Sequence, residues 1–234
     1  MLMKFYPHTI LIVSHMRSGS SLLEHILSTN DEIIGFGEQN RIYKNFIDTK
    51  KMEFYIRKKQ RLFFKNAKYT VDQVLHNQYT PNLSLLNNTF FRLIFLVRSP
   101  DETISSIENL ESKHYSIQNI GLSNSLEYYK NRLEYMLKIK KQTPRSPHFF
   151  LTYSSLIDNP DQTLEKLTDF LSLRTPLKKE YRLKESTGNF GDRSKFIKEG
   201  KIQKIKKELI ELSAEEMIKL NEAYDEINNS FNFK

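Results

Sequence analysis

The sequence predicts an α/β fold, a three-layer sandwich in which helices cover both faces of a central parallel sheet. Short apolar, β-branched runs alternate with longer segments of amphipathic spacing, which is the pattern of strands and helices in such a sheet. The 234 residues show no repeat and contain no cysteine. Because a chain of this length can bury one core, we expect one domain, residues 1–234.

The first half of the chain supplies two predicted strands and two predicted helices. The β-branched run 10–13 predicts a strand, and Gly19 then allows a turn before apolar residues recur at helical spacing. A helix is therefore expected from Ser20. Residues 48–67 are expected to be helical, and residues 69–74 to form the next strand.

The second half predicts two more strands and longer helices. The apolar run 93–97 is a strand, and Pro100 occupies a favourable first helical position. An amphipathic helix over 123–141 precedes a strand over 149–153. A helix over 161–171 and a final helix after the capping box of Ser213 and Glu216 complete the pattern, with a long loop between them.

The turn between the first strand and helix predicts an anion site. The first N–H groups of a helix have no intrahelical partner and lie at the positive end of its dipole, so a phosphate or sulfate can bind them. Arg17 adds a permanent cation beside this turn.

The turn is similar to a P-loop without its lysine. Ser20 and Ser21 follow Gly19, where a P-loop has Lys and then Ser or Thr, and Ser14 replaces the first glycine. Arg98 ends the strand 93–97, where a magnesium-dependent nucleoside triphosphatase would place an aspartate. These features disfavour such an enzyme, and a nucleotide or metabolite kinase with a degenerate loop is kept as an alternative.

A second candidate site follows the strand 93–97. Arg98 closes that strand and Ser106 lies further along the next helix. Since parallel sheets bind ligands beyond the carboxyl ends of their strands, we expect this site and the turn at Gly19 to meet there.

Together the two segments resemble the sulfotransferases that use 3′-phosphoadenosine-5′-phosphosulfate. The 5′-phosphosulfate loop of that family, [KR]-S-G-T-[TS], is matched by residues 17–21, which are Arg17, Ser18, Gly19, Ser20 and Ser21. Its 3′-phosphate motif, an Arg closing a strand and a Ser eight positions on, is matched by Arg98 and Ser106. The loop is also similar to that of tyrosylprotein sulfotransferases.

Two later segments extend the resemblance. Residues 151–173 are similar to the Y-E-D-L, Asn-Pro, helix pattern of the family, with Tyr153 at the position near the adenine and serines in place of the acidic pair. Residues 188–196 are similar to the C-terminal loop that folds over the nucleotide in bacterial members, with Lys195 as a candidate contact.

The resemblance implies a P-loop-NTPase-like sulfotransferase fold and an activity of class EC 2.8.2. The phosphosulfate would be the co-substrate, no metal would be needed, and Arg17 would neutralise the bridge oxygen. A hydroxyl or amine of a small molecule or peptide would be the acceptor. Its identity and the oligomeric state are not predicted.

Two residues compete for the role of the base. Glu38 lies in a segment similar to the G-E-E-T-R motif of tyrosylprotein sulfotransferases, in which an acid is the base. His76 lies in a segment similar to the D-K-x-x-x-N strand end of bacterial members, near the catalytic His of cytosolic ones. A neutral imidazole is a ready base at neutral pH, whereas Glu38 would need its pKa raised by burial.

Composition restricts the partners further. The net charge of +8 is spread over several basic clusters, so attraction of an anionic donor is expected, and a noncatalytic nucleic-acid-binding protein remains the alternative from another class. No recognised nucleic-acid module is present, and we expect Phe54, Tyr55, Phe63 and Phe64 to line the core or an acceptor pocket. Without a predicted leader or membrane span, a cytoplasmic protein without membrane association is expected, and the abundance of Lys, Asn and Ile suggests a bacterium.

Overall fold

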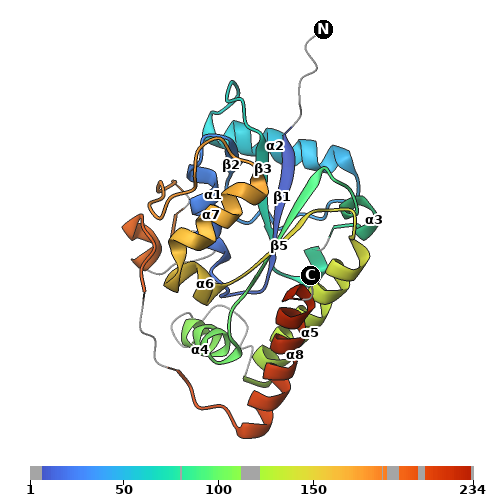
Figure 1. The fold of residues 1–234 in the computed structure, drawn as a ribbon, viewed down its shortest axis with the longest axis vertical. Helices are drawn as coiled ribbons and strands as arrows, with labels where there is room; N and C mark the ends of the chain where they lie inside the picture. Colours follow the sequence, from blue (N-terminus) through green and yellow to red (C-terminus); the bar gives the residue numbers. More distant parts are fainter. Residues whose placement is uncertain are drawn as a thin grey trace.

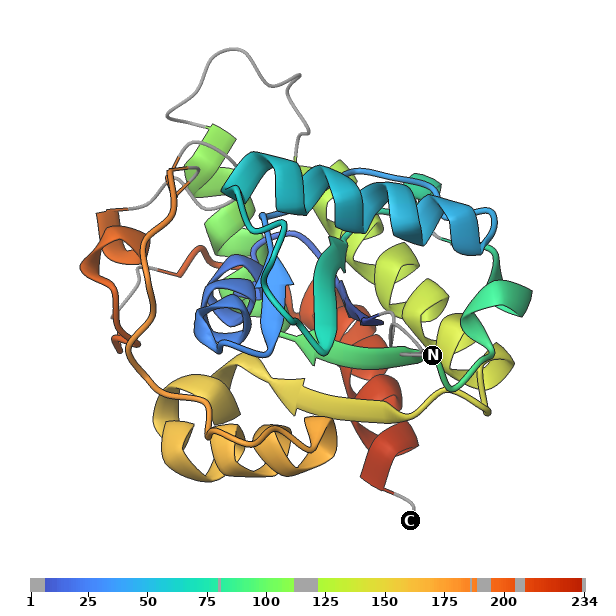
Figure 2. The same ribbon diagram turned by 90° about the horizontal axis from the view of Figure 1, so that it is seen from above.

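The fold is given by a computed structural model that describes residues 7–79, 81–111, 122–185, 187–188, 195–204 and 209–232. Within these ranges the side chains at positions 110, 111, 122, 123, 195 and 232 are left out of the description. Figure 1 shows the arrangement of the elements and Figure 2 the same ribbon from above.

A five-stranded parallel sheet forms the centre of the molecule. Its strands in chain order are β1 (His8–Ser14), β2 (Ile33–Gly35), β3 (Tyr69–Val74), β4 (Phe91–Val97) and β5 (His148–Thr152). Their order across the sheet is β2-β3-β1-β4-β5, which puts β1 in the middle. Because all pairs are parallel, the loops after β1, β3 and β4 leave from the same edge of the sheet.

Helices cover both faces of this sheet (Figures 1 and 2). They are α1 (Ser20–Thr29), α2 (Phe46–Gln60), α3 (Leu83–Leu86), α4 (Pro100–Glu111), α5 (Leu122–Gln142), α6 (Tyr153–Asp158), α7 (Pro160–Leu171) and α8 (Ala214–Asn232). Two short 3₁₀ helices, Asn77–Tyr79 and Lys195–Glu199, complete the described elements.

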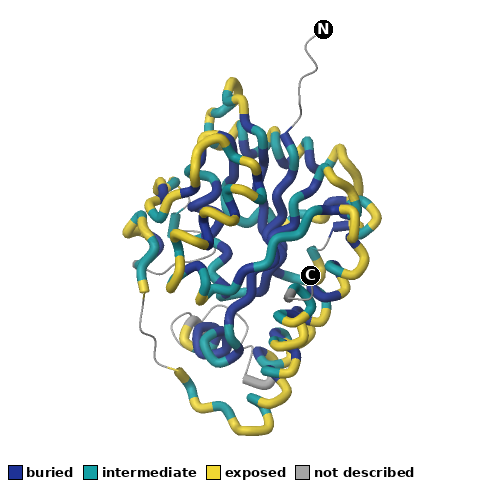
Figure 3. The backbone as a smooth tube through the Cα atoms, in the orientation of Figure 1, coloured by how far each residue is buried: buried dark blue, intermediate teal, exposed yellow. Residues whose placement is uncertain are grey.

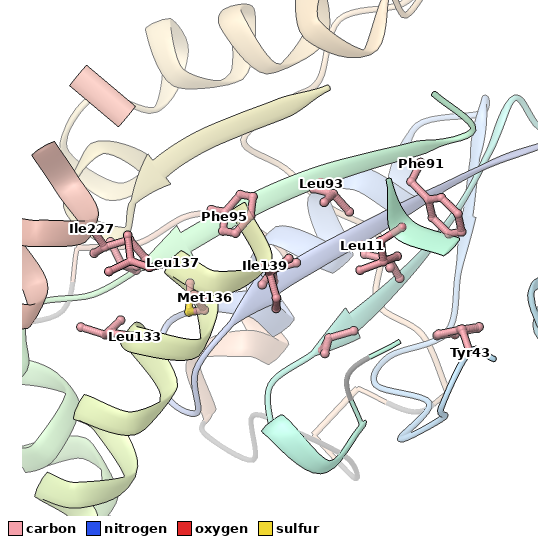
Figure 4. Close-up of a cluster of buried hydrophobic side chains, with 14 of the residues drawn as sticks. Leu11, Tyr43, Phe91, Leu93, Phe95, Leu133, Met136, Leu137, Ile139 and Ile227 are labelled. Atoms are coloured by element: carbon pink, nitrogen blue, oxygen red, sulfur yellow. The ribbon is translucent and has the colours of Figure 1, made fainter. Parts of the chain in front are cut away.

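Two apolar clusters, one on each face of the sheet, give the fold its three layers. Alternate residues of β1 belong to different clusters: Leu11 and Val13 to one, Ile10 and Ile12 to the other. The first cluster packs the sheet against α2, α4, α5 and α8, and Figure 4 shows part of it. The second packs the sheet against α1, α6 and α7. This alternation is what a strand covered on both faces requires, and it confirms the predicted fold class.

The structure also corrects several predicted boundaries. The helix predicted over 48–67 ends at Gln60, because Arg61 adopts a left-handed conformation with φ 55°. Tyr153, predicted as a strand residue, begins α6, since Thr152 caps that helix through Ser155. Strand β2 has only three residues and was not predicted.

The expectation that four aromatic residues near α2 lie in the core or line an acceptor pocket is corrected in part, because three of them are not in the core. Phe54, Phe63 and Phe64 are exposed, and only Tyr55 packs against the core. Figure 3 shows how exposed and buried residues are distributed along the chain.

None of the helices in the described ranges combines the length and apolar character that crossing a bilayer requires.

Candidate functional site

The loop between β1 and α1 leaves the first turn of that helix open to an anion. Gly19 is the N-cap residue, with a left-handed φ of 94°, and it has no side chain that could cap the helix. No acid lies in the first turn. Below the turn, Ser14 Oγ lies 2.6 Å from Ser18 Oγ and 2.5 Å from the carbonyl oxygen of Leu96, which ties the loop to β4. The helix therefore presents its first N–H groups on a fixed turn.

The two arginines of the sequence motifs lie together at this loop. Arg17 Nε donates a hydrogen bond to Ser106 Oγ on α4 over 3.0 Å. Arg98 Nη1 donates to the Arg17 carbonyl oxygen over 3.1 Å, and Arg98 Nε pairs with Glu102 at 3.0 Å. Neither of these Arg98 contacts uses Nη2. The loop after β1 and the loop after β4 thus form one cationic site, as the strand order predicts.

Tyr153 joins these two loops from the end of β5. The guanidinium carbon of Arg98 lies 4.2 Å from the centre of the Tyr153 ring, a cation–π distance. A Cβ atom at Gly19 would lie only 2.6 Å from Cδ2 of the same ring. Glycine is therefore required at position 19 both by the left-handed backbone and by the neighbouring ring.

A buried histidine, His15, holds the backbone of Arg98. Its Nε2 accepts a hydrogen bond from the Arg98 N–H over 3.1 Å, and its Nδ1 lies 2.8 Å from the Met16 carbonyl oxygen. Burial lowers the pKa of His15 to about 3, so the imidazole is neutral and carries its proton on Nδ1. No motif in the sequence pointed to this residue.

Glu38 lies in the loop between β2 and α2, partly buried. Burial and the nearby Asp72 carboxyl raise its pKa to about 7, while the Arg132 cation lowers it. Asp72 is fully buried on β3 and accepts hydrogen bonds from the Gln39 N–H and the Tyr43 hydroxyl, so it also fixes the loop that carries Glu38. Burial raises the pKa of Asp72 itself to about 6.

The other candidate base, His76, lies just after β3. It is half-buried, and its ring lies 5.7 Å from that of Tyr128 and 6.2 Å from that of Tyr79. Burial first, and the charge of Arg132 second, lower the pKa of His76. The imidazole is therefore neutral at neutral pH but a weaker base than an exposed histidine.

Arg132 on α5 is a buried cation that faces the ends of two strands. It is 1% exposed, and its Nε donates to the Ser14 carbonyl oxygen over 2.8 Å. Its two other nitrogens donate to the Val74 carbonyl oxygen and to Asn77 Oδ1. One guanidinium thus caps the carboxyl ends of β1 and β3, and its charge acts on both Glu38 and His76.

Tyr128, one turn before Arg132, fastens the anion loop to the end of β3. Its hydroxyl accepts from the Met16 N–H over 2.8 Å and donates to the Leu75 carbonyl oxygen over 2.9 Å. Neither Tyr128 nor Arg132 lies in a recognisable motif. Their spacing of four places both residues on one side of an amphipathic helix. A polar residue on the buried side of such a helix is unusual, and this was the signal in the sequence that could have identified them.

One predicted contact lies outside the described residues. The side chain of Lys195 and residues 189–194 of the C-terminal loop are not part of the description.

Comparison with known proteins adds the following findings. The sequence model described as "Sulfotransferase family" matches residues 79–176. The sulfotransferase domain from the curacin biosynthetic pathway has a TM-score of 0.52 at 16% identity, with 95% of this chain and 98% of that domain covered. The sulfotransferase domain of the Synechococcus PCC 7002 olefin synthase has a TM-score of 0.60 at 15% identity, with 94% of each chain covered. At such identities the two structures support the fold alone. No curated protein sequence matches the chain.

Proposed function

Because the sulfotransferase family model matches residues 79–176 of this chain, we propose that it transfers a sulfonyl group from 3′-phosphoadenosine-5′-phosphosulfate to a hydroxyl or amine acceptor. The transfer is an in-line displacement that releases adenosine 3′,5′-bisphosphate. Charge develops on the sulfonyl oxygens and on the bridge oxygen, so positioning and electrostatic stabilisation dominate the catalysis, as in phosphoryl transfer.

The observation that carries this proposal is the contact between the two anion-binding motifs. Arg17 of the first motif donates to Ser106 of the second, and Arg98 donates to the Arg17 carbonyl oxygen. Two phosphate sites so close together suit a ligand with phosphates at both ends of one ribose. A nucleotide with a phosphate at one end only would leave one of the two sites unfilled.

In this assignment the backbone of residues 19–21 holds the 5′ phosphate at the start of α1. Arg17 neutralises the bridge oxygen, and we expect its loss to cost about 3 to 4 kcal/mol of barrier, by analogy with other preorganised donors. Arg98 and Ser106 bind the 3′ phosphate, with Arg98 Nη2 free of the contacts made by Nε and Nη1. The ring of Tyr153 provides an apolar surface beside the adenine.

Glu38 is the base that we propose. A glutamate with its ordinary pKa of 4.5 would be too weak a base for this step. Burial and the nearby Asp72 carboxyl raise the pKa of Glu38 to about 7. A carboxylate with that pKa is well matched to removing the proton of an acceptor hydroxyl at neutral pH. His76, whose pKa is lowered, is the second candidate. Glu38 Oε would take the proton as the acceptor oxygen attacks sulfur.

The acceptor itself is proposed only as a hydroxyl or amine of a small molecule, a peptide or a carrier-bound substrate. By their names, one structural relative comes from the curacin biosynthetic pathway and the other from an olefin synthase, so a biosynthetic intermediate is a reasonable first class to screen.

The donor assignment is tested by thermal unfolding without metal in the presence of adenosine 3′,5′-bisphosphate, AMP or ATP. A ligand that binds only the folded state raises Tm with its concentration. We expect the bisphosphate to stabilise the chain most, and Arg98→Ala to abolish that preference. Arg145→Ala, an exposed arginine at the opposite end of the sheet, is the control that should keep it. In a parallel measurement with magnesium, stabilisation by ATP but not by the bisphosphate would instead favour the kinase alternative.

A further inference from the structure

The region around α2 exposes an unusual amount of apolar surface. Nine large apolar side chains are exposed in the described part of the chain, and six of them lie within 42–64. These six are Ile42, Phe46, Ile47, Phe54, Phe63 and Phe64. Since single exposed apolar residues are common but clusters are not, this concentration calls for a partner.

Helix α2 carries apolar residues on both of its sides. Its inner side buries Thr49, Met52 and Ile56 against the sheet. Its outer side presents exposed residues at a spacing of three and four that places them along one stripe. The stripe consists of Ile47, Lys51, Phe54, Lys58 and Arg61. The stripe therefore combines two apolar and three cationic side chains and contains no acid, and the Lys51 ammonium lies 3.6 Å from the carboxylate of Asp48 beside it.

Hydrogen bonds from Arg57 fix the turn after α2, in which Phe63 and Phe64 are exposed. Arg57 Nη1 donates to the carbonyl oxygens of Leu62, at 3.0 Å, and Lys65, at 2.7 Å. Glu53 fixes that guanidinium through a 2.9 Å ion pair with Nε. Phe64 lies within this turn and its side chain is fully exposed, with a relative accessibility of 102%. Its exposure is thus a feature of an ordered turn.

We propose that this surface binds an anionic lipid bilayer at its interface. We call it the α2 face and define it by Ile47, Lys51, Phe54, Lys58, Arg61, Phe63 and Phe64. Its cations are opposite in charge to lipid phosphates and attract them. Its apolar side chains enter the boundary between headgroups and acyl chains, as in interfacial helices. The proposal departs from the expectation of no membrane association, since it assigns peripheral binding without a span.

Two features of the α2 face favour a lipid surface over a macromolecule with fixed shape. The fully exposed ring of Phe64 needs surroundings that close around it, which a fluid interface provides. The rings of Phe54 and Phe63 lie 6.2 Å apart at 58° to each other, so they offer no common plane on which successive nucleic-acid bases could stack.

Cosedimentation of the full chain with vesicles tests the proposal. We expect binding to vesicles of phosphatidylcholine mixed with phosphatidylglycerol, weaker binding to phosphatidylcholine alone, and a decrease with salt. The double variant Phe63→Ser, Phe64→Ser should lower the partition coefficient by about tenfold or more. The double variant Lys51→Glu, Lys58→Glu should lower binding to the mixed vesicles only.

Matched controls remove the same groups from other surfaces. Leu209→Ser with Ile218→Ser removes two exposed apolar residues, and Lys130→Glu with Lys166→Glu reverses two exposed charges. Both controls should bind vesicles like the parent chain. The proposal is overturned if the parent ignores the mixed vesicles, if the controls lose as much binding as the α2 variants, or if the α2 face binds single-stranded RNA and not lipid. Stabilisation by adenosine bisphosphate should be unchanged in all four variants, so this test is independent of the proposed function.

Discussion

Arg17 Nε and Ser106 Oγ are joined by a 3.0 Å hydrogen bond across 89 positions of sequence. The bond connects the loop that precedes α1 with the middle of α4, and it brings together two residues that we propose to act at opposite ends of one nucleotide. A ligand that binds both motifs must therefore be compact, with its two anionic groups close together.

Ser106→Ala should weaken the binding of adenosine 3′,5′-bisphosphate. The substitution removes a hydroxyl that contacts Arg17 and, in our assignment, the 3′ phosphate. Hydrogen bonds to charged groups contribute about 1.5 to 3 kcal/mol, so the affinity should fall by at least tenfold. Isothermal titration calorimetry measures this change, with Ser230→Ala on α8 as the control. An unchanged affinity would exclude Ser106 from the site.

Gly19→Ala should reduce both stability and bisphosphate binding. An alanine would have to adopt a φ of 94°, and its Cβ would overlap the Tyr153 ring at 2.6 Å. Left-handed backbone alone costs about 1 to 2 kcal/mol. The matched control is Gly37→Ala, where φ is also positive but nothing lies within 4 Å of the added Cβ.

The difference between the two glycine variants isolates the Tyr153 contact. Denaturant unfolding should show a larger loss for Gly19→Ala than for Gly37→Ala, and Tyr153→Leu should restore part of that difference. Equal losses would mean that the ring yields without cost and does not fix the loop.

Glu38→Gln should stabilise the fold at alkaline pH. The folded-state pKa of Glu38 is about 7 and its ordinary value is 4.5. The folded protein therefore holds a proton that the unfolded chain has lost between these values, and the free energy of unfolding decreases as the pH rises through this window. The penalty is complete above pH ~7 and amounts to at most about 3 kcal/mol.

Removing the carboxyl should remove most of that penalty. Unfolding in urea at a series of pH values should show Glu38→Gln more stable than the parent at about pH 8 and equal to it near pH 4. Glu165→Gln, an exposed acid on α7, should change neither value. If Glu38→Gln were destabilising at every pH, the carboxyl would have a structural role, and its ionised form would not be the destabilised one in the folded state.

Arg132→Met should destabilise the protein strongly. The change leaves the carbonyl oxygens of Ser14 and Val74 buried without their donor. Each lost partner costs about 1 to 3 kcal/mol, so a total of about 2 to 6 kcal/mol is expected from denaturant unfolding. Arg145→Met, an exposed arginine, should cost far less.

The fold class could be predicted from sequence because it depends on local patterns, and the meeting of the loops that carry Arg17 and Arg98 follows from that fold. The β-branched run before Gly19 and the strand that ends at Arg98 identify parallel strands, and parallel strands place their following loops at one edge. Strand β2 was missed since three residues carry too little periodicity. The end of α2 was misplaced because a left-handed Arg61, unlike a glycine, gives no signal in the sequence.

The residues that shift the pKa of Glu38 and those that hold the loops in place could not be predicted in the same way. Asp72 and Arg132 affect Glu38 through burial and charge, and both come from elements distant in sequence. His15 and Tyr128 act through backbone hydrogen bonds that no motif records. The exposure of Phe54, Phe63 and Phe64 could not be predicted either, because helical spacing does not tell which side of a helix faces the sheet.

A crystal structure of the chain with adenosine 3′,5′-bisphosphate tests the proposed donor site most directly. We expect the 5′ phosphate on the backbone of residues 19–21 and the 3′ phosphate between Arg98 and Ser106. Density for the ligand elsewhere, with the turn at Gly19 empty and Arg98 still paired only with Glu102, would contradict it.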